Sequence, residues 1–149
     1  MKSKRFEPIR DIVSASAKDL SRAMGEAGRK VAELEGKVEQ LKSYRDDYVR
    51  NSQSPATTDA VKLQNYRTFL DRLGDALRQQ LESLAIARAE YDKRRALWSE
   101  KRIEAESLGR VVDRFRKEER HAADQREQRE GDDAALRVSV AARGEAGNR

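Results

Sequence analysis

The feature that most constrains this chain is an apolar ladder with a spacing of seven residues. The ladder comprises Leu63, Leu70, Leu77, Leu84, Tyr91, Trp98, Ala105 and Val112. Seven residues make two turns of a slightly underwound α-helix, so these side chains form one narrow stripe. A stripe of that width is typical of a coiled-coil seam rather than of the broad buried face of a globular helix. The pattern therefore predicts one long helix that needs a partner helix.

A second ladder with the same spacing precedes the first and can supply that partner. This ladder comprises Phe6, Val13, Leu20, Ala27, Leu34, Leu41 and Tyr48. We expect a helix over about 9–50, a loop over about 51–59 and a second helix over about 60–130, because the polar residues and the proline of the middle stretch favour turns. A short loop between two long amphipathic helices predicts an all-α fold, an antiparallel coiled-coil hairpin over residues 1–130.

The two ladders also predict which layers of the hairpin face each other. The expected pairs are Tyr48–Leu63, Leu41–Leu70, Leu34–Leu77, Ala27–Leu84, Leu20–Tyr91, Val13–Trp98 and Phe6–Ala105. In this register Arg10 lies opposite Lys101, with Arg94, Arg95 and Arg102 close by. Because facing like charges repel, we expect the open end of the hairpin to fray or to be held by an acidic partner.

The ends of the second helix carry three further expectations. Either Thr58 or Asp59 can cap its beginning by accepting a backbone N–H bond. Its ladder continues past the end of the first helix, so that register leaves Leu108, Val112 and Phe115 with nothing in the chain to cover them. The glycine-rich stretch over 131–149 reads as a weakly ordered C-terminal tail.

Composition excludes most enzyme classes for this chain. Charged residues make up 40% of the 149 residues and aromatic residues only 5%, which favours solvated helices over a packed globule. There is no cysteine, no nucleophile motif and no metal-ligand cluster, and the single histidine, His121, lies in a charged stretch. We therefore expect no enzyme activity, no cofactor and no metal.

The net charge of +5 arises from basic and acidic residues that are interleaved along the chain. Nucleic-acid grooves usually concentrate basic residues with aromatic residues between them, so a nucleic-acid partner is not expected. No long apolar run and no signal peptide occur, which predicts a soluble cytoplasmic chain without direct membrane insertion.

Several apolar residues near the loop lie beside the seam and not on it. Leu41, Tyr44 and Tyr48 share one strip of the first helix. On the second helix the spacing i, i+4, i+7, i+11 aligns Phe69, Leu73, Ala76 and Gln80. These residues either widen the seam or form a docking patch for another protein, because exposed apolar clusters commonly bind partners.

Three short runs give the chain a resemblance to the flagellar FliJ family, the small coiled-coil component of the flagellar type III export apparatus. They are Tyr44-Arg45-Asp46-Asp47-Tyr48, Asn65-Tyr66-Arg67-Thr68-Phe69-Leu70 followed by Leu73, and Trp98 followed by Lys101 and Arg102. The resemblance covers most of residues 6–120. It implies a hairpin similar to the central stalk of rotary ATPases, peripherally associated with the inner membrane at the flagellar base.

The resemblance also implies partners. The open end of the hairpin would enter the hexameric export ATPase and promote assembly and activity of the ring, with Arg10, Arg94, Arg95, Lys101 and Arg102 as contact residues. The loop half would contact the cytoplasmic part of the export gate membrane protein through Leu41, Tyr44, Tyr48, Phe69, Leu73, Ala76 and Gln80. Export chaperones would be further partners. The alternatives are a generic coiled-coil scaffold or tether, a similar role in a non-flagellar secretion system, and a nucleic-acid binder whose affinity depends steeply on salt.

Overall fold

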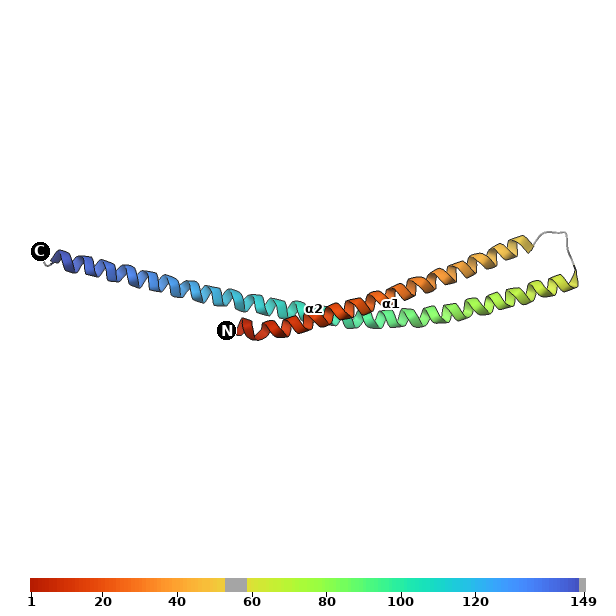
Figure 1. Cartoon of the computed structure of the whole chain (residues 1–149), viewed down its shortest axis with the longest axis horizontal. Coiled ribbons are helices and arrows are strands. Elements are labelled where there is room, and N and C mark those ends of the chain that lie inside the picture. Colours follow the sequence, from red (N-terminus) through yellow and green to blue (C-terminus); the bar gives the residue numbers. More distant parts are fainter. Residues whose placement is uncertain (53–58, 148–149) are drawn as a thin grey trace. The chain divides into compact units, whose positions relative to one another are not determined.

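A computed structural model describes residues 1–52 and 59–147 of the chain. It contains two helices, α1 (Lys2–Ser52) and α2 (Ala60–Gly147), and no strand occurs within the described ranges (Figure 1). The two helices pack against each other as a hairpin, so the predicted all-α antiparallel pair is confirmed.

The beginning of α2 is fixed by a capping residue. The Asp59 Oδ1 atom accepts a hydrogen bond from the backbone N–H of Val61 at 3.3 Å, and the Asp59 carbonyl accepts one from the N–H of Leu63 at 3.0 Å. A side chain that binds a free N–H of the first turn in this way is an N-cap. Of the two predicted caps, Asp59 is therefore the N-cap of α2, and Thr58 lies outside the described residues. Within the predicted loop, Asn51 and Ser52 still belong to α1.

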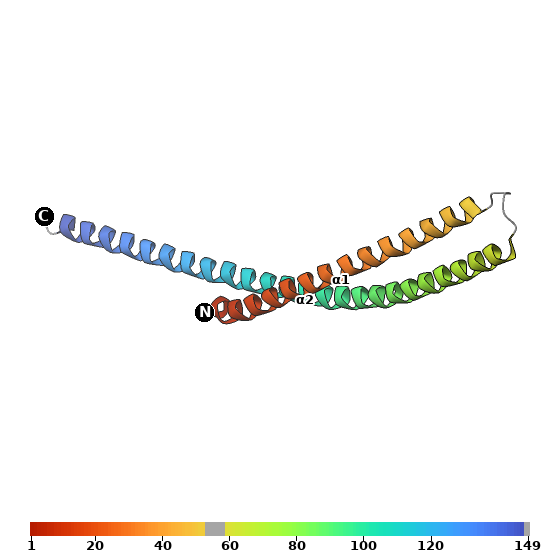
Figure 2. The same cartoon turned by 45° about the vertical axis from the view of Figure 1, so that its right-hand side comes forward.

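The chain divides into two compact units, each made from both helices. The terminal unit combines Met1–Ala15 with Arg102–Arg149, and the loop-side unit is Ser16–Lys101. In the loop-side unit α1 and α2 run side by side in both views of the chain (Figures 1 and 2). Both ladders pass through both units, and Leu63 is the only ladder residue that is exposed.

The core of the loop-side unit is a seam of apolar residues from the two helices, some of which belong to the ladders. Its buried members are Leu34, Val38, Leu77, Leu84 and Ala87, with Val31 and Leu41 packed against them. Residues three, four and seven apart on each helix meet the partner helix, as expected of a coiled coil. Since water is removed only along this strip, the stability of the unit depends on a small number of apolar side chains.

The register of the hairpin differs from the predicted one by one heptad. Tyr91 was expected opposite Leu20, but its ring lies against Gly28, where an added Cβ would be 3.4 Å from Cε2. Tyr48 was expected opposite Leu63, but its ring contacts those of Tyr66 and Phe69 instead. A ladder with a period of seven coincides with itself after a shift of seven, so its pattern cannot select between these registers. The sizes of the facing residues select the register. Gly28 has no side chain, so the Tyr91 ring fits against it.

The same shift corrects the prediction for the terminal unit. Val112 is completely buried, and the Phe115 ring lies 5.5 Å from that of Phe6, although both were expected to be uncovered. Helix α1 also begins at Lys2 rather than near residue 9, and it continues through Pro8. The additional turns persist because their side chains reach α2, which an isolated N-terminus would not provide.

Past the residues that pack against α1 in the terminal unit, α2 continues as a helix that no described part of α1 covers. Residues 121–147 are helical, and every one of them is exposed. The sequence suggested that the helix would end near 130 and that a tail would follow. Since tertiary packing usually supplies most of the stability of a helix, the extension relies on its own backbone hydrogen bonds.

Candidate partner-binding surfaces

An aromatic cluster marks the part of the loop-side unit nearest the loop. The ring centroid of Phe69 lies 4.4 Å from that of Tyr48 and 6.0 Å from that of Tyr44, while Tyr48 stacks on Tyr66 at 5.4 Å. Both helices contribute, since Tyr44 and Tyr48 belong to α1 and the other two rings to α2. Tyr44 remains 55% exposed. The ring contacts of this cluster thus join α1 to α2, while Tyr44 remains accessible to solvent.

The remaining patch residues are divided between the seam and its rim. Leu41 packs against the core, while Leu73 and Ala76 are half-buried. Gln80 is unusual, because its side-chain Oε1 is buried and has no hydrogen-bond partner. A buried acceptor without a donor costs free energy. Leu41 thus belongs to the seam and the Phe69 ring contacts two rings of α1, whereas Tyr44 is more than half exposed.

Three of the basic residues expected at the ATPase contact lie in the loop-side unit. Arg94 reaches across the hairpin, where its Nη1 donates to the carbonyl of Ala23 at 2.9 Å, and its Nε donates to Glu90 at 3.0 Å. Arg95 is exposed on α2, and Lys101 is half-buried. Arg94 thus has a structural role in holding the two helices together, which its position in the sequence did not indicate.

The other two basic residues of that set lie in the terminal unit. Arg10 donates to Asp11, with the closest atoms 3.0 Å apart, and its Cδ lies 4.0 Å from the position of a Cβ added to Gly109. Arg102 is exposed. The expected repulsion of Arg10 by a facing lysine followed from the earlier register, and the shift of one heptad gives Arg10 a glycine as its neighbour instead.

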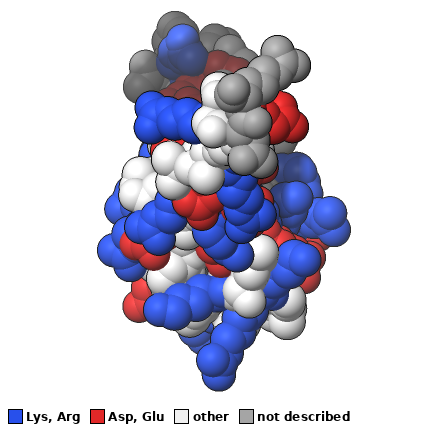
Figure 3. Space-filling view, turned by 90° about the vertical axis from the view of Figure 1, so that its left-hand side faces the viewer, with Lys and Arg blue, Asp and Glu red and all other residues white. Residues whose placement is uncertain are grey.

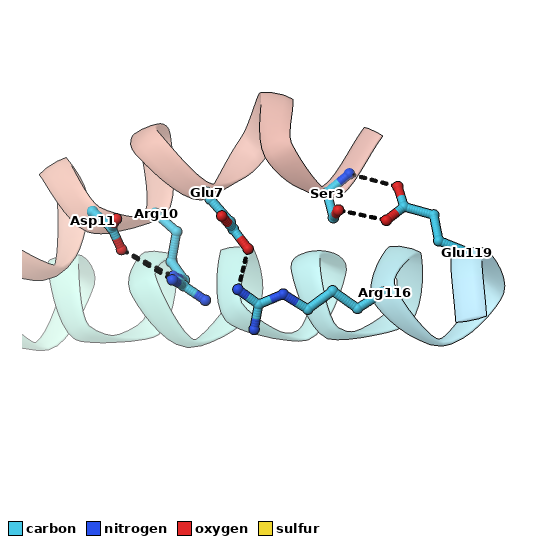
Figure 4. A network of polar contacts seen from close by, with 6 residues as sticks. All are labelled: Ser3, Glu7, Arg10, Asp11, Arg116 and Glu119. Carbon is cyan, nitrogen blue, oxygen red and sulfur yellow. Dashed lines mark hydrogen bonds and ion pairs between the residues drawn. The ribbon is translucent and has the colours of Figure 1, made fainter. Parts of the chain in front are cut away.

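One ion pair and two hydrogen bonds connect the helices of the terminal unit (Figure 4). Glu119 of α2 accepts two hydrogen bonds from Ser3, at 3.0 Å from its backbone N–H and at 2.6 Å from its hydroxyl. One turn away, Arg116 forms an ion pair with Glu7. The sequence analysis missed both contacts, because they become visible only once the register is known.

The contact with Ser3 has an electrostatic consequence for Glu119. The first N–H groups of a helix lack intrahelical partners and form the positive end of its dipole. The side-chain and backbone hydrogen bonds from Ser3 lower the pKa of the Glu119 carboxyl below its usual value. Glu119 therefore caps α1 from the neighbouring helix.

We expect this cap to open on acidification. Because the pKa of Glu119 is lowered in the folded state, its contribution to stability is present above the pKa of the unfolded chain and is lost as the pH falls through the folded value. Amide hydrogen exchange at Ser3 should accelerate relative to the intrinsic rate as the pH drops below about 4.3, the ordinary pKa of a Glu carboxyl. In the Glu119→Gln variant this dependence should disappear. A dependence that persists in the glutamine variant would contradict the assignment.

Basic and acidic groups are interleaved on the face shown in Figure 3. Within 1–52 and 59–147 no cluster of three or more His, Asp or Glu residues could hold a metal ion, and His121 is exposed. Neither described helix is long and apolar enough to cross a membrane.

The fold is that of a two-helix coiled-coil protein. The family model described as "Flagellar FliJ protein" matches residues 1–144. The chain belongs to the FliJ family, a non-catalytic component associated with flagellar protein export. Comparison with curated proteins and with solved structures finds no match.

Proposed function

We propose that this chain is the coiled-coil stalk that links the hexameric export ATPase to the export gate. In this role exposed basic residues of α2 contact the ATPase, and the loop-side aromatic cluster docks on the cytoplasmic part of the gate. Export chaperones are brought by the same protein, which acts at the cytoplasmic side of the inner membrane. Membership of the FliJ family over residues 1–144 is the observation that carries the proposal.

The aromatic cluster supports the gate end of the proposal. Tyrosine is enriched at the energetic centres of protein interfaces, because it combines a large apolar ring with a polar tip. Tyr44 is more than half exposed, yet its ring is held at one edge by Phe69. A side chain that is already ordered loses little freedom on binding, so such a position favours docking.

The basic residues support the ATPase end. Arg95 and Arg102 are both exposed, and they lie one heptad apart on α2. Exposed arginines on a helix are suited to carboxylates on a partner, and complementary charge increases the rate and the specificity of docking. Arg94 bonds to the Ala23 carbonyl and to Glu90, so its replacement would also disturb the hairpin.

The test is ATP hydrolysis by the purified export ATPase in the presence of this protein. The double variant Arg95→Glu, Arg102→Glu should lose most of the stimulation, because repulsion replaces attraction at the contact. Its helicity by circular dichroism should be unchanged, and so should its binding to the gate domain. The matched control is Lys62→Glu, Arg67→Glu, which makes the same change of charge at two exposed positions near the other end of α2.

The control variant should stimulate the ATPase as the wild type does. Full stimulation by the Arg95→Glu, Arg102→Glu variant, at low and at high salt, would remove these residues from the ATPase contact. Equal losses in both double variants would mean that overall charge matters and that no basic contact exists at this position.

A further inference from the structure

The seven-residue period gives the hairpin two registers that bury the same apolar ladders. In the observed register Leu34 is level with Leu84, and a slip of α1 by one heptad would bring it level with Leu77. Each ladder residue of α1 meets a ladder residue of α2 in both cases, so the burial of these side chains does not separate the two registers. Contacts that exist in only one register must therefore select it.

Two residues of α2 make such contacts across the seam of the loop-side unit. The Tyr91 ring lies against Gly28, and Nη1 of Arg94 donates to the Ala23 carbonyl at 2.9 Å. Arg94 occupies a seam position, seven residues after the buried Ala87, and its side chain is only 35% exposed. A polar residue at a seam position specifies the register of a coiled coil, because it finds its partner at one alignment only.

The part of α1 that receives these two side chains consists of small residues. They are Ala23, Ala27 and Gly28, which we call the window. A helical side chain leans toward the N-terminus and covers the turn before its own Cα, so the residue at position 27 decides whether the carbonyl of Ala23 can be reached. Alanine leaves this carbonyl open to Arg94, and Gly28 leaves room for the ring of Tyr91.

One heptad earlier, α1 offers no such window. The equivalent residues there are Ser16, Leu20 and Ser21, all of which are larger. After a slip the Leu20 side chain would cover the Ser16 carbonyl, so Arg94 would lose its backbone acceptor. A half-buried donor without its acceptor costs free energy, and Leu20 would also occupy the space that Tyr91 needs.

We propose that Tyr91 and Arg94 latch α1 in the observed register, and that opening this latch lets α1 slip along α2 by one heptad. Such a slip is a movement of about 10 Å along the helix axis. The rings of the aromatic cluster are in contact at centroid distances of 4.4 to 6.0 Å, so a slip would take the cluster apart. The latch therefore controls whether that surface exists, and this inference does not depend on the export role.

Moving the window tests the latch without changing the composition of the chain. The exchange Leu20→Ala with Ala27→Leu closes the present window and opens an equivalent one a heptad earlier. Tyr91 and Arg94 should then seat in the new window, so the register should slip by one heptad. The matched control, Leu81→Ala with Ala85→Leu, exchanges the same residue types at two exposed positions of α2 and should leave the register unchanged.

The absence of cysteine from the sequence allows pairs of cysteines to report the register. Val31 packs against the cluster that contains Ala87, whereas Met24 becomes level with Ala87 only after the slip. Under mild oxidation the pair Val31→Cys, Ala87→Cys should cross-link within the wild-type chain about tenfold more than the pair Met24→Cys, Ala87→Cys, because a disulfide requires Cα atoms within about 7 Å. In the exchanged chain this preference should reverse.

An exchanged chain that keeps the wild-type preference would overturn the latch. Circular dichroism shows whether the helices of each variant are intact. If the exchange unfolds the hairpin, Leu20→Ala alone provides the milder test, because it opens the second window and leaves the first unchanged. Both cysteine pairs should then cross-link, and absence of the cross-link between positions 24 and 87 would also overturn the latch.

The part played by Arg94 is tested by two replacements at the same position. Arg94→Met keeps an apolar stem but cannot donate a hydrogen bond, whereas Arg94→Lys retains a donor. The methionine variant should form more of the cross-link between positions 24 and 87, and the lysine variant should return it toward the wild-type level. A methionine variant with the wild-type preference would overturn the role of Arg94 in the latch.

Discussion

Replacement of Leu84 by alanine should lower the free energy of unfolding by about 2–5 kcal/mol. Leu84 is only 4% exposed and belongs to the buried cluster with Leu34, Val38 and Ala87. Truncation there removes apolar contacts from both helices and leaves a cavity in a seam that has no second layer behind it. Chemical denaturation monitored by circular dichroism, at one fixed protein concentration, measures the change.

Leu81→Ala is the matched control for this prediction. Leu81 lies on the same helix one turn earlier and is 42% exposed, so the same atoms are deleted outside the seam. Its replacement should change the free energy of unfolding by about 0.5 kcal/mol or less, as is usual for surface positions. If the two alanine variants lose equal stability, the seam is not what holds the loop-side unit together.

Replacement of Tyr44 by alanine should weaken binding to the export gate by about thirtyfold or more, as expected for an interface hot spot. The melting temperature should change little, because the side chain is 55% exposed and only one ring contact is lost. Calorimetric titration of the purified gate domain with this protein measures the affinity. This prediction depends on the proposed docking of the aromatic cluster.

Phe69→Ala provides the contrast. Phe69 touches the rings of both Tyr44 and Tyr48 and is half-buried, so its loss should reduce stability as well as gate binding. Tyr48 lies on the seam itself, so its replacement would change helix packing and docking together and could not separate the two. A Tyr44→Ala variant that binds the gate as tightly as the wild type would assign the cluster to hairpin packing alone.

The hairpin could be predicted from the sequence because a seven-residue apolar period has only one common structural solution. Its register could not, since the same period makes neighbouring registers equivalent in hydrophobicity. The volumes of facing side chains in a few layers distinguish the registers: Tyr91 fits beside Gly28, and Phe115 covers Phe6. Such information is contained in pairs of residues far apart in the chain, and no single stretch displays it.

The candidate surfaces were predicted unevenly for a related reason. The spacing of Tyr44 and Phe69 beside the seam correctly suggested that the two rings are neighbours. The cap made by Glu119 was missed, because it depends on which residues of α1 and α2 are level. Arg94 was predicted as an ATPase-contact residue, and its bond to a backbone carbonyl of the other helix was not foreseen.

The uncovered part of α2 over 121–147 has a consequence for cooperativity. The packed turns before it supply the costly nucleus, so this segment needs only to propagate a helix that already exists. Its free C-terminal end and its glycines, Gly131, Gly144 and Gly147, favour melting from the C-terminus inward, one turn at a time. Heating should therefore remove ellipticity in two stages: a gradual, almost linear loss from the extension, and a sigmoidal loss when the paired helices separate.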